Sequence, residues 1–299
     1  MLDKTTETPS AARIAANESS ESLSGPFPVA ENYDRYFASH LYDRRYPRPN
    51  PASLAVIVEQ IRARGGRVLD FGCGNGRYAA PLLAQTEATI VAYDISREAI
   101  DELSARYPAQ VADGRLRPVW GDLAALSRTT MAQGEPFDLA IMMFGVLGHI
   151  ASRTQRRETL ATIHQLLRPG GRLIVTVPNA ARRFRRHQAE ARPLMEKGVL
   201  EPGDIHYQRM AGQVMVKMYY HLYSLEEFGM ELERQGFRLI QMGAESFLPE
   251  SGVVRSPFLR GLDRLLAIFA PLRYAYGFLA VAETAPEANS PVDRSHGAG

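Results

Sequence analysis

A strand-like run that ends in an aspartate and leads into three closely spaced glycines is the feature that most constrains this fold. The run 68–71 is apolar except for Asp70, and Gly72, Gly74 and Gly76 follow at alternate positions before a helix-like stretch. Glycines between a strand and a helix N-terminus let the backbone approach a ligand closely, because any Cβ would collide with it. The stretch therefore predicts a nucleotide-like ligand at the start of a helix.

The spacing of these glycines separates two classes of nucleotide-binding loop. The dinucleotide fingerprint G-x-G-x-x-G places its last glycine three residues after the second one, and Arg77 occupies that position here. The pattern in this chain is instead D-x-G-x-G-x-G, with an acidic residue ahead of the first glycine. A dehydrogenase is therefore the least favoured class.

A second strand-like run, Thr89–Asp94, is β-branched and continuous until it ends in an aspartate. Such runs are typical of parallel strands that are buried on both faces. Asp94 lies roughly 20 residues past the glycines, where an acid at a strand end can accept hydrogen bonds from two ribose hydroxyls. The alternative is an aspartate that only caps the next helix. We expect Ser96 to be the N-cap of that helix.

Two further strands are predicted, and candidate ligand contacts follow both of them. Leu116–Trp120 leads to Asp122 and Leu123, and Phe137–Phe144 leads directly to Gly145. Ligands of open α/β sheets bind at the carboxyl ends of the strands. The sequence therefore places these residues at the same edge as the glycine loop, with a plain turn residue as the alternative for Asp122.

These features, with the turn Pro169-Gly170-Gly171 before a fifth strand, occur in an order that resembles the class I methyltransferases, which use S-adenosylmethionine. The resemblance covers about residues 65–180. It implies an α/β fold with a Rossmann-like, mostly parallel sheet of seven strands and helices on both faces. The implied strand order is 3-2-1-4-5-7-6, with strand 7 antiparallel.

The same resemblance implies S-adenosylmethionine as the cofactor. In that family the glycine loop cradles the methionine part, and an acid in the place of Asp122 accepts a hydrogen bond from the adenine amino group. The end of the fourth strand faces the reactive methyl group. The implied cofactor-binding residues are Asp70, Gly72, Gly74, Gly76, Asp94, Asp122, Leu123, Phe144 and Gly145.

His149 follows the fourth strand and is the candidate general base. A base is needed only when the nucleophile carries a proton at neutral pH, and an unperturbed histidine with a pKa of about 6.5 suits that task. The alternative is a histidine that packs or caps at the next helix.

The chain is expected to divide into four parts. We expect a disordered tail over residues 1–25, an N-terminal lid segment over 26–51, a methyltransferase domain over 52–284 and a second disordered tail over 285–299. The lid segment is rich in aromatic residues interleaved with arginine, and a helix packed on the domain edge is its alternative. A substrate-side insertion is expected at about 181–223.

This insertion contains the densest group of positive charges in the chain. Residues 181–192 hold five arginines and one acid, and a β-hairpin with arms 204–209 and 213–220 follows, turning at Ala211-Gly212. The arginines indicate an anionic substrate or RNA phosphates, and a solvated helix face is the alternative. The candidate substrate-binding residues are Tyr42, Arg45, Arg182, Arg183, Tyr220 and His221, with hairpin packing as the alternative for the last two.

A narrower resemblance concerns the methyl acceptor. The segments Arg45–Pro49, Gly74–Tyr78 and Tyr219–Tyr223 are similar to motifs of the tRNA wobble-uridine carboxymethyl methyltransferases, although the first lacks their tryptophan. A small-molecule acceptor is favoured instead, because the aromatic lid and the Met- and Tyr-rich hairpin suit an apolar cavity. The alternatives are a tRNA acceptor and a non-catalytic cofactor-binding subunit.

Composition restricts the remaining possibilities. The net charge of +2 indicates no global field for nucleic acid or membranes, and Cys73 is the only cysteine, so neither a disulfide framework nor a Cys-rich metal site is possible. No metal is expected. No stretch reaches the ~20 apolar residues of a membrane span, and the N-terminus lacks a signal pattern, so a cytoplasmic location is expected. Nothing in the sequence indicates an oligomeric state.

One late segment remains ambiguous. Phe258–Phe269 has large apolar residues on one helical face and charged residues opposite. We expect this helix to pack on the sheet, with a helix lying on a membrane surface as the alternative.

Overall fold

The computed structural model describes residues 29–131, 134–211 and 214–285. The tail expected over residues 1–25 and nearly all of the tail expected over 285–299 lie outside these ranges, as does Gly212 of the expected hairpin turn. Among the described residues, no helix is long and apolar enough to cross a membrane.

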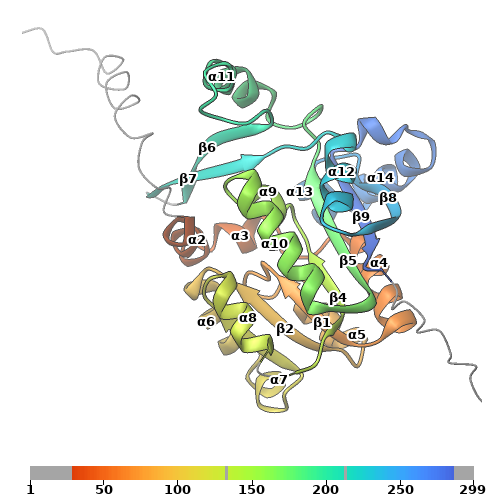
Figure 1. Cartoon of the computed structure of the whole chain (residues 1–299). Helices are drawn as coiled ribbons and strands as arrows, with labels where there is room; N and C mark the ends of the chain where they lie inside the picture. Colours follow the sequence, from red (N-terminus) through yellow and green to blue (C-terminus); the bar gives the residue numbers. More distant parts are fainter. Residues whose placement is uncertain (1–28, 132–133, 212–213, 286–299) are drawn as a thin grey trace, which may run out of the picture.

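A seven-stranded sheet in the order β3-β2-β1-β4-β5-β9-β8 forms the centre of the molecule (Figure 1). The first five strands in sequence pair in parallel, whereas β9 runs antiparallel to both β5 and β8. This confirms the implied order, because β8 and β9 are the sixth and seventh strands once a separate hairpin is set aside. The strands are β1 Arg67–Phe71, β2 Thr89–Asp94, β3 Leu116–Trp120, β4 Phe137–Met142, β5 Leu167–Pro178, β8 Arg238–Ser246 and β9 Gly277–Glu283.

Helices cover both faces of this sheet, which explains why its central strands β1, β2 and β4 are largely apolar and buried. Val68 points to a core with α4, α5 and α6, and its neighbour Leu69 points to a core with α8, α10 and α12, because adjacent residues of a strand face opposite sides. The helices are α4 Pro51–Arg64, α5 Ala79–Gln85, α6 Arg97–Arg106, α7 Pro108–Ala112, α8 Leu123–Met131, α9 Val146–His149, α10 Arg153–Leu166, α12 Leu225–Arg234 and α13 Glu250–Arg255.

Local signals place several element ends where the sequence predicts them. β2 and β3 have the predicted bounds, and the Ser96 side chain accepts a hydrogen bond from the backbone N–H of Ala99 as the N-cap of α6. β5 begins earlier than expected and includes the Pro169-Gly170-Gly171 segment, where Gly170 has a φ of +70°. The turn is therefore a local irregularity within an extended strand.

A third layer covers the carboxyl ends of the strands. It consists of α2 Val29–Ala38, α3 Leu41–Arg45, α11 Arg185–Glu196 and the hairpin of β6 Asp204–Ala211 and β7 Val214–His221. Figure 1 shows α2 and α3 between the hairpin and α6, and α2 contacts both α6 and β7. Aromatic side chains of the N-terminal segment and of the hairpin share one cluster. Its aromatic members include Tyr36, Phe37, Tyr42, Tyr46, Tyr207 and Tyr220.

The helix α14 Pro257–Phe269 packs on the sheet only in part. Its one fully buried residue is Asp263, which accepts hydrogen bonds from the backbone N–H groups of Phe247 and Leu248. Phe258 and Phe269 are each 78% exposed. The helix contacts β8 of the sheet as expected, and Leu266 packs against the main core. The expectation is wrong only for the rest of the apolar face, most of which is exposed. The 3₁₀ helix Leu272–Tyr274 then leads into β9.

Candidate active site

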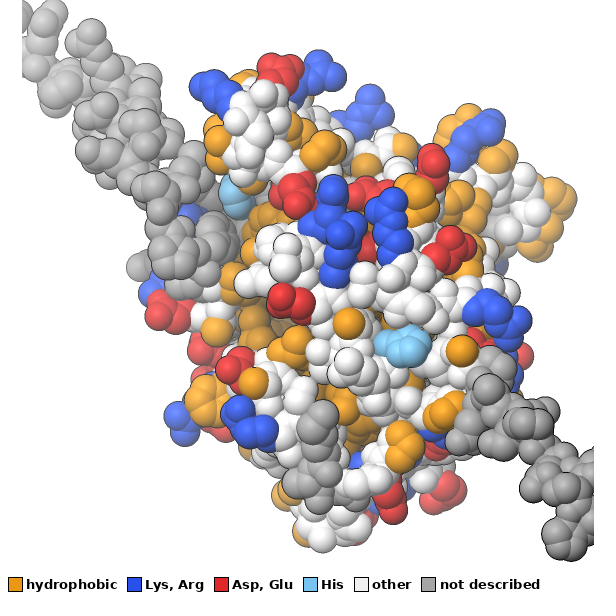
Figure 2. All heavy atoms as spheres, in the orientation of Figure 1, with side chains coloured by type: hydrophobic (Ala, Val, Ile, Leu, Met, Phe, Trp, Pro, Cys, Tyr) orange, Lys and Arg blue, Asp and Glu red, His pale blue; other side chains and the backbone are white. Residues whose placement is uncertain are grey.

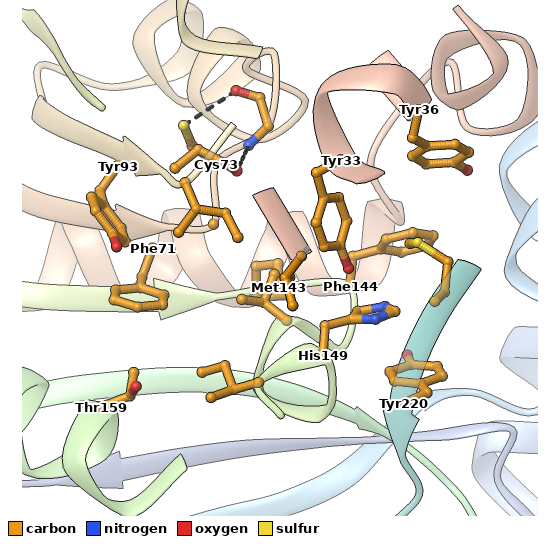
Figure 3. A pocket seen from close by; sticks show the side chains of 18 of the residues that line it. Tyr33, Tyr36, Phe71, Cys73, Tyr93, Met143, Phe144, His149, Thr159 and Tyr220 are labelled. Atoms are coloured by element: carbon orange, nitrogen blue, oxygen red, sulfur yellow. Dashed lines mark hydrogen bonds between the residues drawn. The ribbon is translucent and has the colours of Figure 1, made fainter. Parts of the chain in front are cut away.

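A cavity of about 480 Å³ opens at the carboxyl ends of β1 to β4. The strand ends form one side of it, and α2, α3 and the hairpin form the other. Figure 3 shows Phe71 and Tyr93 at one end of the cavity and His149 and Tyr220 at the other. The cavity thus joins the predicted cofactor loop to the predicted substrate-side insertion.

The glycine loop is held against β2 by Asp94. Oδ2 of Asp94 accepts a hydrogen bond from the Gly74 N–H at 2.8 Å, and Oδ1 of Asp94 accepts one from the Ser96 N–H at 2.8 Å. Gly72 has a φ of +73°, and a Cβ there would lie 2.6 Å from a methyl carbon of Val146. The loop therefore needs glycine for its conformation and for close packing at once.

Two buried carboxyl groups face the cavity at this loop. Burial raises the pKa of Asp70 to about 7, with a further contribution from Asp94, and Oδ2 of Asp70 has no hydrogen-bond partner among the described residues. Burial also raises the pKa of Asp94 to about 6, although backbone N–H groups oppose that rise. A cationic ligand would satisfy both carboxylates, because an opposite charge stabilises the ionised form.

Arg77 is a structural cation rather than a mere substitute for a glycine. Its Nη2 lies 2.8 Å from Glu250 Oε1 of α13, and its Nε donates to the Arg48 carbonyl at 2.8 Å. The guanidinium also lies 4.7 Å from the centroid of the Phe144 ring. Arg77 thereby ties the glycine loop to the segment before α4 and to α13.

Aromatic side chains line the other half of the cavity. The rings of His149 and Tyr220 stack at 4.0 Å with an angle of 8° between their planes, and Tyr33 meets His149 edge-on at 5.8 Å. In the hairpin, Tyr207 pairs with Met218 across the two strands, and both line the cavity. A planar or apolar group fits such walls.

The surroundings of His149 oppose its protonation. Burial lowers its pKa to about 3, and its Nδ1 lies 3.0 Å from the Tyr219 carbonyl oxygen. In the neutral ring an Nδ1–H donates to that carbonyl. A group with so low a pKa accepts a proton poorly at neutral pH, which argues for a positioning role over the predicted role of general base.

Two arginines reach the aromatic half of the cavity. Arg183 lies over the rings of Tyr276 and Tyr220, at 4.8 and 5.5 Å, and its Nε is buried without a partner among the described residues. Arg209 lies 5.1 Å from the Tyr207 ring. In the described part of the chain, neither guanidinium has a carboxylate within 4.0 Å, although Glu245 attracts Arg183 from farther away.

The structure brings most of the predicted site residues together. Those that line the cavity are Tyr42, Asp70, Gly72, Gly74, Asp94, Asp122, Leu123, Phe144, His149, Arg183 and Tyr220. Sequence reasoning missed Tyr33, Tyr207, Arg209 and Met218 as site residues. The alternation of the hairpin could have indicated three of them, because Tyr207 and Arg209 share one face with Met218.

Three predicted substrate contacts lie elsewhere. Arg45 and Arg182 are exposed, and Arg182 donates to the Tyr274 carbonyl at 2.8 Å. His221 is fully buried at the end of β7, where its Nδ1 lies 2.7 Å from Asp204 Oδ1 and its Nε2 lies 3.2 Å from Glu227 Oε1. These positions correct the expectation of substrate contact, because a hydrogen-bond network holds His221 away from the cavity.

Two predicted cofactor glycines also serve packing. A Cβ on Gly76 would lie 2.5 Å from a methyl carbon of Leu103, and one on Gly145 would lie 2.2 Å from the Tyr220 hydroxyl. Neither lines the cavity. Gly76 lets the loop pack closely on α6, and Gly145 lets the end of β4 pack closely against the hairpin.

The strand order, the glycine loop after β1 and the acids after β2 and β3 together define the class I methyltransferase fold. The family model described as a methyltransferase domain matches residues 37–242. The chain therefore belongs to this family.

Individual relatives are more distant. The chain is similar to a ubiquinone biosynthesis O-methyltransferase of Xylella fastidiosa, with 31% identity over 165 residues, or 50% of this chain and 62% of that protein. An O-methyltransferase of Pyrenophora dematioidea is 30% identical over 123 residues, or 41% of this chain and 43% of that protein. The chain thus spans about half the length of the curated relatives it matches. Among solved structures, the CcbJ methyltransferase of Streptomyces caelestis superimposes with a TM-score of 0.56 at 17% identity, covering 85% of this chain and 98% of that one.

Proposed function

We propose that this protein transfers a methyl group from S-adenosylmethionine to a small-molecule acceptor. The observation that carries this proposal is one cavity with two unlike halves. One half offers a glycine loop and two buried carboxyl groups, and the other is walled by aromatic rings. The named activities of the relatives are consistent with such a transfer.

The residues at the strand ends fit this cofactor. Gly72 and Gly74 present backbone without a side chain to the cavity. Asp94 retains further lone pairs for ribose hydroxyls beside its two backbone contacts. The unpartnered Oδ2 of Asp70 suits a cationic part of the ligand. When bound, S-adenosylmethionine supplies a methyl group activated by its sulfonium.

The protein's own contribution is alignment and exclusion of water. We propose that α2 and α3 act as the roof of the cavity, because Tyr33, Phe37 and Tyr42 line it from above the strand ends. Holding two reactants close together and correctly aligned lowers the activation barrier by up to ~7–11 kcal/mol in favourable cases. His149, neutral and stacked on Tyr220, would orient the acceptor, and a carboxylate acceptor would need no base.

Cofactor binding is expected to depend on pH. The free protein holds protons on Asp70 and Asp94 below pH values of about 7 and about 6, and a bound cation favours the carboxylates. The affinity for S-adenosylmethionine should therefore fall as the pH is lowered. For one linked proton, this decrease approaches about tenfold per pH unit. Isothermal titration with S-adenosylmethionine at a series of pH values around 6 and 7 measures this change in affinity. The Asp70→Asn variant should flatten the profile between about pH 6 and 7, where Asp70 alone titrates, and a flat wild-type profile would contradict this placement of Asp70.

We further propose that the acceptor carries an anionic group. Arg183 and Arg209 lack a close carboxylate among the described residues, and both line the aromatic half of the cavity. An anionic oxygen would form charge-assisted hydrogen bonds with them. Aromatic walls next to a cationic anchor suit a small acid with a planar body.

The acceptor can be found with deuterated cofactor. We would incubate the protein with S-adenosylmethionine bearing a deuterated methyl group and a metabolite extract, and then search by mass spectrometry for a labelled product. A labelled small acid supports the proposal. Cofactor binding without any labelled product would favour the non-catalytic subunit, and absence of cofactor binding would refute both.

Replacing Arg209 by methionine is expected to separate acceptor binding from cofactor binding. Loss of a charge-assisted hydrogen bond of ~1.5–3 kcal/mol should lower kcat/KM for the labelled acceptor by about 10- to 100-fold. The dissociation constant of S-adenosylhomocysteine should stay unchanged. Arg185→Met, on the exposed side of α11, is the matched control. Equal turnover of wild type and Arg209→Met would refute the anionic anchor.

The structure does not strengthen the tRNA alternative. The arginine cluster divides, since Arg183 enters the cavity while Arg185 and Arg186 stay outside, and Arg186 pairs with Glu190 at 2.8 Å. Binding of tRNA at ~50 mM salt, where phosphate contacts are strongest, would revive that alternative.

A further inference from the structure

The outward face of α14 gathers five exposed large apolar side chains that the proposed function does not use. Phe258, Phe269 and Ile268 are 78%, 78% and 72% exposed, and Leu265 is 52% exposed. With Leu262 these residues form what we call the α14 face. Figure 2 shows hydrophobic side chains gathered at the upper right, where Figure 1 places α14.

The spacing of these residues produces a continuous stripe. Phe258, Leu262, Leu265 and Phe269 follow each other by four, three and four residues, which is the repeat of one side of an α-helix. The opposite edge is occupied by Asp263, whose carboxylate accepts the N–H groups of Phe247 and Leu248 at 2.8 Å. These bonds orient the helix with its apolar stripe away from the core.

The exposed charges of the segment 251–276, which contains the stripe, have one sign. Arg255, Arg264 and Arg273 are exposed and Arg260 is half-buried, and none of them has a carboxylate within 4.0 Å in the described part of the chain. The only acidic residue between positions 251 and 276 is Asp263, which is buried. The surface therefore combines exposed phenylalanine and leucine with uncompensated positive charge.

We propose that the α14 face binds the surface of an anionic lipid bilayer. A helix in the interfacial plane buries large apolar side chains at the boundary of the acyl chains, while arginines beside it meet anionic headgroups. The charge pattern favours such a surface over a second copy of this chain, because two α14 faces would bring like-charged arginines together.

This docking would place the membrane close to the substrate side of the molecule. The Arg273 carbonyl accepts a hydrogen bond from the Asn179 side chain at the end of β5, and the Tyr274 carbonyl accepts one from Arg182. The proposal is independent of methyl transfer, because it rests on residues outside the cavity.

Vesicle sedimentation tests the proposal directly. The full chain would be mixed with vesicles of phosphatidylcholine alone and with vesicles that also contain about one-third phosphatidylglycerol. We expect binding to the anionic vesicles, weakened by high salt because screening reduces the headgroup attraction. Absence of binding to the anionic vesicles, or equal binding to both, would overturn the proposal.

Paired variants identify the surface. Phe258→Ser with Phe269→Ser should lower partitioning to anionic vesicles by at least about tenfold, as should Arg255→Gln with Arg264→Gln. Val199→Ser removes an exposed apolar side chain outside α14 and should change nothing. Unchanged circular dichroism would show that the variants fold. Unchanged vesicle binding by either pair would overturn the proposal, as would a wild-type dimer that the phenylalanine pair abolishes.

Discussion

Arg77→Met is expected to lower the free energy of unfolding by about 3–5 kcal/mol. The side chains of Arg77 and Glu250 are 3% and 8% exposed, and Nη2 lies 2.8 Å from Oε1. Removing the arginine leaves the Glu250 carboxylate buried without its counter-charge, near the buried Glu245. It also removes the hydrogen bond from Nε to the Arg48 carbonyl. Chemical denaturation monitored by circular dichroism measures the loss.

Two controls distinguish the stability effect of this buried ion pair from the effect of removing any arginine. The double variant Arg77→Met with Glu250→Gln should recover part of the stability, because no buried charge is then left alone. Arg186→Met breaks the exposed pair with Glu190, whose side chains are 88% and 55% exposed, and should cost less than ~1 kcal/mol. Equal effects of Arg77→Met and Arg186→Met would contradict the role assigned to Arg77.

Asp94→Asn is expected to weaken binding of S-adenosylhomocysteine by about 10- to 100-fold. The substitution removes a charged acceptor whose hydrogen bonds are worth ~1.5–3 kcal/mol, and 1.4 kcal/mol corresponds to about tenfold in affinity. It also puts an amide where the carboxylate accepts from the Gly74 and Ser96 N–H groups. An amide can accept only one of these two hydrogen bonds, so the loop should lose order as well as the proposed ribose contact.

Isothermal titration of the wild type and the variant measures this loss. Asp101→Asn is the matched control, because Asp101 is an exposed acid on the neighbouring α6 and its ion pair is with Arg97 of the same helix. The control should keep wild-type affinity. If Asp94→Asn also kept it, the assignment of the ribose contact to Asp94 would be wrong, and the two backbone hydrogen bonds would be the residue's whole role.

The contrast between Asp94 and Arg77 shows what local sequence reveals. Asp94 is predictable because a continuous apolar strand ends in it, and the position of a strand end relative to a glycine loop depends on a short stretch of chain. The same holds for β2 and β3, whose bounds follow from runs of apolar residues. Arg77 is recognisable in sequence only as a missing glycine, because its partner Glu250 is 173 residues away.

The candidate site divides in the same way. The loop and the acids at the strand ends are predictable, since the carboxyl ends of parallel strands always meet at one edge of the sheet. The aromatic half of the cavity is not predictable, because it forms where α2, the residues after β5 and the hairpin converge. Arg209 enters it and His221 is excluded from it, although both belong to the same hairpin.

The sequence by itself determined where the strands and the glycine loop lie along the chain, because hydrophobic patterning and backbone conformation act over a few residues. The order of the strands in the sheet followed from the resemblance to the class I methyltransferases. The tertiary structure alone decided that Arg77 is an internal ion-pair partner, that burial lowers the pKa of His149 to about 3, and that α14 turns its apolar face outward. Burial and charge pairing depend on neighbours brought together by folding. They are therefore properties of the packed chain that no single segment contains.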